Sequence, residues 1–333
     1  MRRLAIALLG ISYLIFFRPS VVAAEEFFVA HWNCENLFDT VDDPNVTGDE
    51  EFTPDGPKHW TEQHLETKLD NLAKIICKMK DGRGPDVLGL CEIENRRVVE
   101  MLVERLGSLG RDYQIVHKDS PSERGIDCAL VYDAKVFQLA DSKFHRVDAG
   151  NTREIVEAKL VNAGVPLFVF VDHWPAQTHD ESQRCIAADV LRKRLDEILA
   201  TDPQADAVAV GDFNEDPDAV ALKDHLHAVD SGEKMPAGNV FDTLAPIHAE
   251  GKGTFVWNDK WQMLDHILIT PGMLDEAGYR WKPGSSHPVD FPELLFHSKR
   301  EGAIDSPSKS YTKNNFHKDG FSDHLPVGCT IVK

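Results

Sequence analysis

The feature that constrains the fold most strongly is a short apolar run that ends on polar residues. Residues 207–210 (Ala-Val-Ala-Val) are enough for a buried strand and too few for a helix. Gly211 follows, and then Asp212 and Asn214, whose spacing directs both side chains to one side of an extended chain. A carboxylate beside an amide can align a water molecule against a phosphate. The same residues are common in turns, so the segment alone does not separate a turn from a catalytic site.

Further apolar runs along the chain have the same form. Strands are predicted at residues 27–33, 85–91, 113–117, 126–132, 154–161, 166–173, 253–257 and 262–270, with a last strand after His324. Apolar residues at helical spacing predict helices at 61–82, 95–106 and 181–199, the first two capped by Thr61 and Asn95. Strands and helices that alternate in this way predict an α/β domain built in layers.

The N-terminus has the form of an export signal. Arg2 and Arg3 precede an apolar run at residues 4–17, and residues 22–24 are small enough for cleavage after Ala24. An uncleaved anchor is the alternative, but the run is shorter than the roughly 20 residues of a membrane span, and Arg18 interrupts it. The sequence therefore predicts a signal peptide at 1–24, a secreted or periplasmic protein, and no stable membrane insertion.

Residues 25–333 fit one domain, in which 271–320 is predicted to be a long loop or insertion because it is polar and rich in Pro, Gly and Ser. The full chain has a formal net charge of −19. Loss of three arginines with the signal leaves 33 basic against 55 acidic residues, a net charge of −22. Such a surface repels polyanions, which argues against a pure nucleic-acid-binding module. It does not exclude a phosphodiesterase whose metal ion supplies positive charge. No protein partner is predicted, and we expect a monomer.

An acidic segment at residues 39–57 is a separate candidate for a cation site. Its acidic side chains include Asp39, Asp42, Asp43, Asp49, Glu50 and Glu51. Their spacing does not match the regular pattern of an EF-hand loop. The sequence therefore favours a solvated loop over a calcium site.

Polar residues that end or interrupt the predicted strands form one set of candidates for chemistry. They are Asn33, Glu92, His173, Asp212, Asn214, Asp265, Asp323 and His324. Because strand ends converge on one rim of a layered sheet, these groups would be buried together, at a free-energy cost unless they are paired or bind a metal. Carboxylate and amide oxygens suit Mg²⁺ or Mn²⁺. Histidines with acidic partners suit acid–base chemistry and charge stabilisation at phosphorus.

Seven short segments resemble the endonuclease/exonuclease/phosphatase superfamily, typified by pancreatic deoxyribonuclease. The first three are Trp32-Asn-Cys-Glu-Asn-Leu-Phe-Asp39, Leu90-Cys-Glu-Ile-Glu-Asn95 and Arg124-Gly-Ile-Asp127. The others are Asp172-His-Trp-Pro175, Gly211-Asp-Phe-Asn214, Leu264-Asp-His-Ile267 and Ser322-Asp-His324. They occur in the order of the family. The resemblance implies a four-layer α/β sandwich, two facing mixed β-sheets flanked by helices, with the site at one end of the sheets.

The resemblance also implies a role for each matching residue. Glu92 would be the principal metal ligand, with Asn33 and Asp323 completing the shell around Mg²⁺, or else Mn²⁺ or Ca²⁺. Asp212 would orient or deprotonate the attacking water, and Asn214 would hold a phosphate oxygen. His324 would contact the phosphate, oriented by Asp265. His173 would be the second phosphate-contacting histidine, with Asp119 as the candidate for its acidic partner. Arg124 would contact phosphate or cap its loop.

The His-Trp-Pro and Asn-Leu-Phe-Asp segments resemble exported bacterial nucleases of this superfamily. The expected reaction is metal-assisted, in-line attack of water on a phosphodiester, in DNA or RNA. The inositol-phosphatase branch is disfavoured, because it has Asp-Arg where this chain has Asp265-His266. A secreted phosphodiesterase of the sphingomyelinase type, another phosphoesterase and a non-catalytic binding member remain as alternatives.

Overall fold

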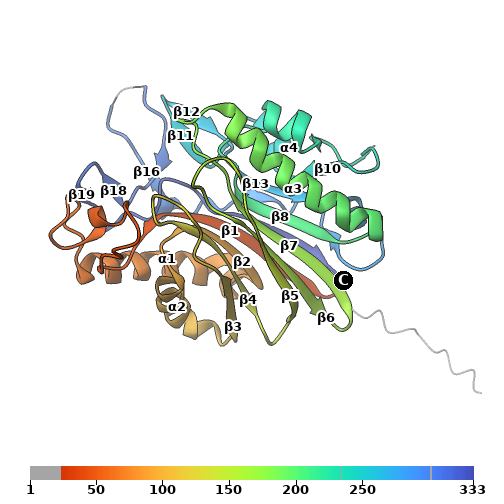
Figure 1. Ribbon diagram of the computed structural model, residues 1–333, viewed down its shortest axis with the longest axis horizontal. Helices are drawn as coiled ribbons and strands as arrows, with labels where there is room; N and C mark the ends of the chain where they lie inside the picture. The colour runs from red at the N-terminus through yellow and green to blue at the C-terminus, as the bar shows by residue number, and fades with distance from the viewer. Residues whose placement is uncertain (1–23, 234, 301) are drawn as a thin grey trace, which may run out of the picture.

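The computed structural model describes residues 24–233, 235–300 and 302–333. Two seven-stranded β-sheets face each other, and helices cover their outer faces (Figure 1). This is the expected four-layer α/β sandwich. The predicted signal peptide lies outside the described residues, apart from Ala24. No helix in the described part of the chain is long and apolar enough to cross a membrane.

The first sheet has the strand order β14-β20-β1-β2-β4-β3, and β15 also pairs with β20. Its central pair, β1 and β2, is parallel. The bounds are β1 (Glu26–Leu37), β2 (Val87–Ile93), β3 (Tyr113–His117), β4 (Asp127–Asp133), β14 (Arg280–Trp281), β15 (His287–Pro288) and β20 (Val327–Val332).

The second sheet has the order β5-β6-β7-β8-β13-β10-β9. Strands β7 and β8 are parallel, and β13 is antiparallel to β8. The bounds are β5 (Gln138–His145), β6 (Ile155–Asn162), β7 (Val165–His173), β8 (Ala207–Asp212), β9 (Ala228–Val229), β10 (Val240–Asp242) and β13 (Asp265–Ile269). The sequence did not predict β5, β9 and β10. Strand β5 has only half-buried and exposed positions, without regular alternation, and its few apolar residues give a weak periodic signal.

Three apolar clusters separate the layers. Side chains from the inner faces of both sheets, such as Val29, Val171 and Val210, form the middle cluster. Helices α1 (Glu62–Gly82) and α2 (Arg96–Arg105) pack on the first sheet, and α3 (Glu181–Thr201) packs on the second. The predicted caps are present, since the Thr61 side chain accepts from the His64 amide and Asn95 from the Val98 amide. The short helix α4 (Ala245–Ala249) follows β10.

The remaining elements are short hairpins and single helical turns. The hairpins are β11 (Phe255–Trp257) with β12 (Lys260–Gln262), β16 (Leu295–Phe296) with β17 (Ser306–Pro307), and β18 (Tyr311–Thr312) with β19 (Asn315–Phe316). The helical turns are Glu50–Phe52, Leu106–Leu109, Ala221–His225, Pro271–Leu274 and Pro292–Leu294. The segment 271–320 therefore contains two strands of the first sheet and two of the hairpins. The strand predicted at 262–270 divides into β12 and β13, because the Met263 amide bonds the Asp216 side chain instead of a neighbouring strand.

Candidate active site

The ends of three neighbouring strands bring acidic and histidine side chains together. His173 at the end of β7 is in register with Asp212 at the end of β8, and Asp265 at the start of β13 is in register with Asp212 from the other side. From the facing sheet, Asn33 on β1 and Glu92 on β2 approach the same rim. Residues far apart in the sequence thus meet because both sheets end there.

The backbone at this rim is unusual for its residue types. Glu92 and Asn214 have left-handed φ angles of 55° and 53°. Gly211 is tightly packed, since a Cβ at this position would lie 2.2 Å from the carbonyl oxygen of Asp172. Conformations of this kind cost free energy and persist where the surrounding structure holds them, as it often does at functional sites.

One carboxylate oxygen of Asp212 is the centre of the arrangement. Asp212 Oδ2 accepts a hydrogen bond from Asn33 Nδ2 at 2.9 Å. The same oxygen lies 3.6 Å from His173 Nε2 and 3.7 Å from His324 Nε2. The other oxygen, Oδ1, accepts from the Asn214 backbone amide at 3.0 Å. Asp212 is 1% exposed, so this single oxygen faces two imidazoles and is largely shielded from bulk solvent.

Asp265 holds His324 from behind. His324 Nδ1 is 2.7 Å from Asp265 Oδ2, so that Nε2 points toward Asp212. His31 Nε2 is 3.1 Å from the other oxygen of Asp265. The sequence identified the Asp265–His324 pair and missed His31. His31 lies inside an apolar strand, where alternation assigns it to the same side as Asn33, and this was the available signal.

The two histidines are driven toward opposite protonation states. Burial disfavours the charged form of His324, but Asp265 and Asp212 outweigh it and raise its pKa well above the usual value. Burial, with Arg153 and Arg124 nearby, lowers the pKa of His173 well below the usual value. Burial also raises the pKa of Asp212 to about 6, against the opposing effect of His324. The arrangement therefore combines a base that titrates near neutrality, a positively charged imidazole and a neutral one.

Glu92 and Asp323 are the carboxylates that could hold a metal ion at the mouth of the site. Both line a pocket of about 390 Å³ together with Asp212, Asn214 and both site histidines. Glu92 Oε2 accepts from the Asn36 amide, while Oε1 faces Arg124 at 3.5 Å and His173 at 4.0 Å. Burial opposes ionisation of Glu92, but Arg124 and His324 lower its pKa, so the carboxylate is charged. One or two carboxylates with room for waters fit Mg²⁺, which keeps part of its hydration shell.

Asn33 is placed less simply for metal binding. Its Oδ1 accepts from the Glu35 amide at 2.9 Å and its Nδ2 donates to Asp212. The side-chain oxygen of Asn33 would therefore bind a metal ion while it also accepts the hydrogen bond from the Glu35 backbone amide. Among the described residues, the group at this site whose potential ligand atoms lie within 4.8 Å of one another is Asp212, Asp265 and His324, and it does not include Glu92.

The two remaining candidates differ in their placement. Arg124 lines the pocket, where its guanidinium contacts Glu92 and the Asn36 side chain. Asp119 is not brought to His173. Its side chain is 86% exposed and lies 4.0 Å from His117 instead. Within the described part of the chain, His173 Nδ1 is buried and has no hydrogen-bond partner, so no described residue acts as the expected acidic partner of this histidine.

Arg153 is a buried charge near the site that sequence reasoning missed. It is 7% exposed and donates to the Trp174 carbonyl oxygen, which also accepts from Asn214 Nδ2. Its charge contributes to the pKa shifts of Glu92 and His173. A lone arginine at the start of a strand carries no distinguishing pattern, so only the fold reveals this contact.

A family profile described as "Endonuclease/Exonuclease/phosphatase family" matches residues 28–333. The chain belongs to this family. It is accordingly a hydrolase acting on phosphoric ester bonds. No curated protein sequence matches the chain significantly.

Solved structures support the family fold. An endonuclease/exonuclease/phosphatase family protein from Bacteroides thetaiotaomicron has a TM-score of 0.58 at 17% identity, covering 93% of this chain and 95% of the other. A mannosyl-6-phosphatase from the same organism has 0.58 at 16%, covering 92% and 100%. The human Nocturnin catalytic domain, with a bound sulfate anion, has 0.55 at 18%, covering 93% and 98%. At these identities the likeness establishes the fold.

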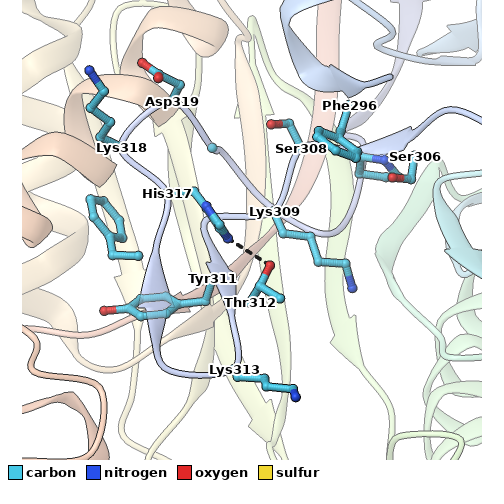
Figure 2. Close-up of a pocket in the computed structure, with 13 residues that line it drawn as sticks. Phe296, Ser306, Ser308, Lys309, Tyr311, Thr312, Lys313, His317, Lys318 and Asp319 are labelled. Atoms are coloured by element: carbon cyan, nitrogen blue, oxygen red, sulfur yellow. Dashed lines mark hydrogen bonds between the residues drawn. The ribbon is translucent and has the colours of Figure 1, made fainter. Parts of the chain in front are cut away.

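A second hollow of about 760 Å³ adjoins the pocket of this phosphoester hydrolase. Phe296 and residues between 306 and 320 line it, and Figure 2 shows Lys309, Lys313 and Lys318 around it, with His317 hydrogen-bonded to Thr312. Lys309 Nζ lies 3.7 Å from Asp323 and 5.4 Å from the ring centre of Phe255, both of which line the pocket. Lys309 thus brings a positive charge next to the site, and the hollow beyond it is lined by two more lysines and by Asp319.

Proposed function

We propose that the protein is a secreted, Mg²⁺-dependent endonuclease that hydrolyses phosphodiesters of DNA or RNA by in-line attack of water. The observation that carries this is the placement of Asp212 Oδ2 between the Nε2 atoms of His173 and His324, at the pocket that Glu92 lines. Mn²⁺ or Ca²⁺ could replace Mg²⁺ at the same ligands, since all three are oxygen-seeking cations.

Each side chain has a role that follows from its environment. Asp212, with a pKa of about 6, is ionised at neutral pH and takes a proton from the attacking water. His324 is held protonated by Asp265 and stabilises negative charge on the phosphoryl oxygens. Asn214 is fixed by Asp212 and Trp174 at the pocket wall, where it orients the substrate.

The remaining charges, on the departing oxygen and the phosphoryl group, are assigned to His173 and to a cation that would bind at Glu92. A neutral His173, buried and close to Asp212, hydrogen-bonds the phosphate and assists the departing oxygen. Glu92, with Asn33 and Asp323, would hold a cation, which when bound would supply Lewis-acid stabilisation of the phosphoryl group. Arg124 lies beside Glu92 and adds a second positive charge at the pocket mouth.

A polymeric substrate is favoured by what surrounds the pocket. The hollow with Lys309, Lys313 and Lys318 can follow a phosphate backbone away from the cleaved bond. On the hairpin β11–β12, Phe255 lines the pocket and Trp257, which also lines it, is 61% exposed. An exposed indole at a catalytic pocket provides a stacking surface for an unpaired base.

The test is incubation of residues 25–333 with supercoiled plasmid, total RNA and sphingomyelin vesicles, each with Mg²⁺ and with chelator. Metal-dependent nicking of plasmid or internal cleavage of RNA is expected. Release of phosphocholine alone would identify the substrate as the phosphodiester of a lipid headgroup instead of a nucleic acid. Turnover of p-nitrophenyl phosphate without any diester cleavage would replace the endonuclease with a phosphomonoesterase. Binding without turnover would leave the non-catalytic alternative.

Export completes the proposal and is supported by the leader at residues 1–24. Expression of the full chain with a C-terminal tag is expected to yield a protein beginning at residue 25 outside the cytoplasm, as read by N-terminal sequencing. Retention of Met1 on a cytoplasmic product would contradict it.

A further inference from the structure

A second group of carboxylates lies outside the active site, where the 39–57 loop folds against the ends of β1 and β2. A pocket of about 380 Å³ is lined there by seven acidic residues: Asp39, Asp42, Asp43, Asp49, Glu94, Asp119 and Asp127. None of the described residues that line it is a lysine or an arginine. Asp127 pairs with His117 and Asp39 with Arg97, and burial raises the pKa of Glu94 to about 8. The uncompensated negative charge of this hollow is therefore centred on Asp42, Asp43 and Asp49, which repel each other unless a cation is bound among them.

Asp49 gives this cluster the character of a binding site. It is 2% exposed, and its Oδ2 accepts from the Asp43 amide at 2.7 Å. Its Oδ1 is buried and has no hydrogen-bond partner among the residues that the structure describes. A buried carboxylate oxygen without a donor is costly and points to a missing partner. One ligand oxygen each from Asp42, Asp49 and Glu50 can be chosen so that all three lie within 4.8 Å of one another.

We propose that Asp42, Asp49 and Glu50 bind a calcium ion that is distinct from the active-site metal. The three ligands are hard oxygens with no histidine or cysteine among them, which disfavours zinc and copper. Two of the three side chains are exposed, so water molecules can complete the shell. Calcium accepts six to eight oxygens in irregular geometry, whereas magnesium demands a near-ideal octahedron. The sequence favoured a solvated loop here, and the buried, unpaired oxygen of Asp49 is what changes that interpretation.

The ion would connect this loop to the active site. The loop packs tightly on the segment that carries Arg124, because a Cβ on Gly48 would lie 2.6 Å from the Glu123 carbonyl oxygen and 2.7 Å from the Arg124 Cα. Arg124 in turn contacts Glu92. A bound calcium ion therefore holds the loop in place. Because the loop packs on the segment of Arg124, the ion also fixes the position of Arg124 at the pocket mouth.

The experiment is thermal unfolding of residues 25–333 in constant Mg²⁺, with EGTA or with 5 mM CaCl₂. For a site with the affinity of extracellular calcium modules, we expect calcium to raise Tm by about 2–5 °C. Asp49→Asn should abolish this rise, and calorimetric titration with CaCl₂ should lose one binding site. Asp55→Asn, an exposed acid of the same loop outside the cluster, and Glu92→Gln, in the active site, should both keep the rise.

The variants also separate metal binding from a purely structural role. Since Asp49→Asn removes charge repulsion, its Tm in EGTA should equal or exceed that of the wild type. If Asp49→Asn does not fold, Asp42→Asn, whose side chain is exposed, takes its place and should lose the same rise. A calcium-induced rise that survives in these variants would overturn the site. So would a wild type that neither binds calcium nor gains stability from it. An equal rise with added Mg²⁺ alone would overturn the choice of calcium.

Discussion

Replacement of Asp212 by Asn tests the proposed chemistry most directly, because it removes one charge and little volume. The Asp212 carboxylate accepts from Asn33 on one oxygen and from the Asn214 amide on the other. An asparagine can accept only one of these bonds, at a cost of about 1 kcal/mol. Removal of the buried charge, in contrast, raises the stability of the folded protein. Because the pKa of Asp212 is raised from 3.8 to about 6, its ionised form costs the folded protein about 3 kcal/mol at neutral pH.

The two effects predict that stability and activity change in opposite directions. Asp212→Asn should unfold at the same or a higher temperature than the wild type. Its kcat/KM should fall by about 10³-fold, within the 10²–10⁴ that general-base catalysis contributes. In the wild type, a pKa of about 6 leaves about 97% of Asp212 ionised at pH 7.5 and about 9% at pH 5. Activity should therefore drop about tenfold between these pH values, and the variant should lose this acidic limb.

The assay is hydrolysis of bis(p-nitrophenyl) phosphate and plasmid nicking at saturating Mg²⁺. Asp172→Asn is the matched control, since Asp172 is equally buried, has a pKa raised by burial to about 7, and does not line the pocket. It should gain stability and keep its activity. More than a tenth of wild-type kcat/KM in Asp212→Asn would refute the assigned role. An equal loss in Asp172→Asn would show that the effect is structural.

Three further predictions rest on other contacts. His324→Gln should lower kcat about 10²–10³-fold with little change in KM, because it removes a positive charge needed in the transition state. Stopped-time assays at saturating substrate measure kcat, and a change in KM alone would contradict this role. Lys318→Ala should lower the rate of DNA or RNA cleavage and reduce its salt dependence, while bis(p-nitrophenyl) phosphate turnover stays at the wild-type rate. An equal loss of activity on both substrates would show that the hollow does not bind the nucleic acid. His266 is buried against Asp242, which raises its pKa to about 9 despite burial, so its stabilising contribution is complete below pH 6.5 and is lost as pH rises through 9. Urea unfolding from pH 6 to 9.5 should show a steeper loss of stability for the wild type than for His266→Gln, and parallel curves would contradict this.

Much of the site was predictable because its residues end strands. Glu92, His173, Asp212 and His324 follow or end apolar runs, and the fold brings them to one pocket. The sequence could also assign Asp265 to His324, through the family resemblance. It placed Asp119 beside His173, but the β3–β4 connection turns this side chain outward to solvent and His117. Loop conformation depends on packing between distant segments, and no local pattern encodes it.

Other contacts could be found only in three dimensions. Arg153 reaches the site from just before β6, where a single polar residue is equally consistent with a surface position. The pairing of Lys309 with Asp323 depends on how the hairpins β16–β17 and β18–β19 pack beside the pocket. The orphan oxygen of Asp49 is likewise a property of burial, which the spacing of acidic residues does not report.

The amino-acid sequence by itself determined the alternation of strands and helices, the polar residues at strand ends and the order of the family segments, because these depend on periodicity and residue type along a continuous stretch. The tertiary structure alone decided which of these residues touch, how far each is buried and therefore which way its pKa moves. Electrostatic interactions depend on distance and solvent exposure, and both arise only when the two sheets pack face to face. For this reason the sequence could name the residues of the Asp212 site, while their protonation states, and the buried oxygen of Asp49, follow from the fold.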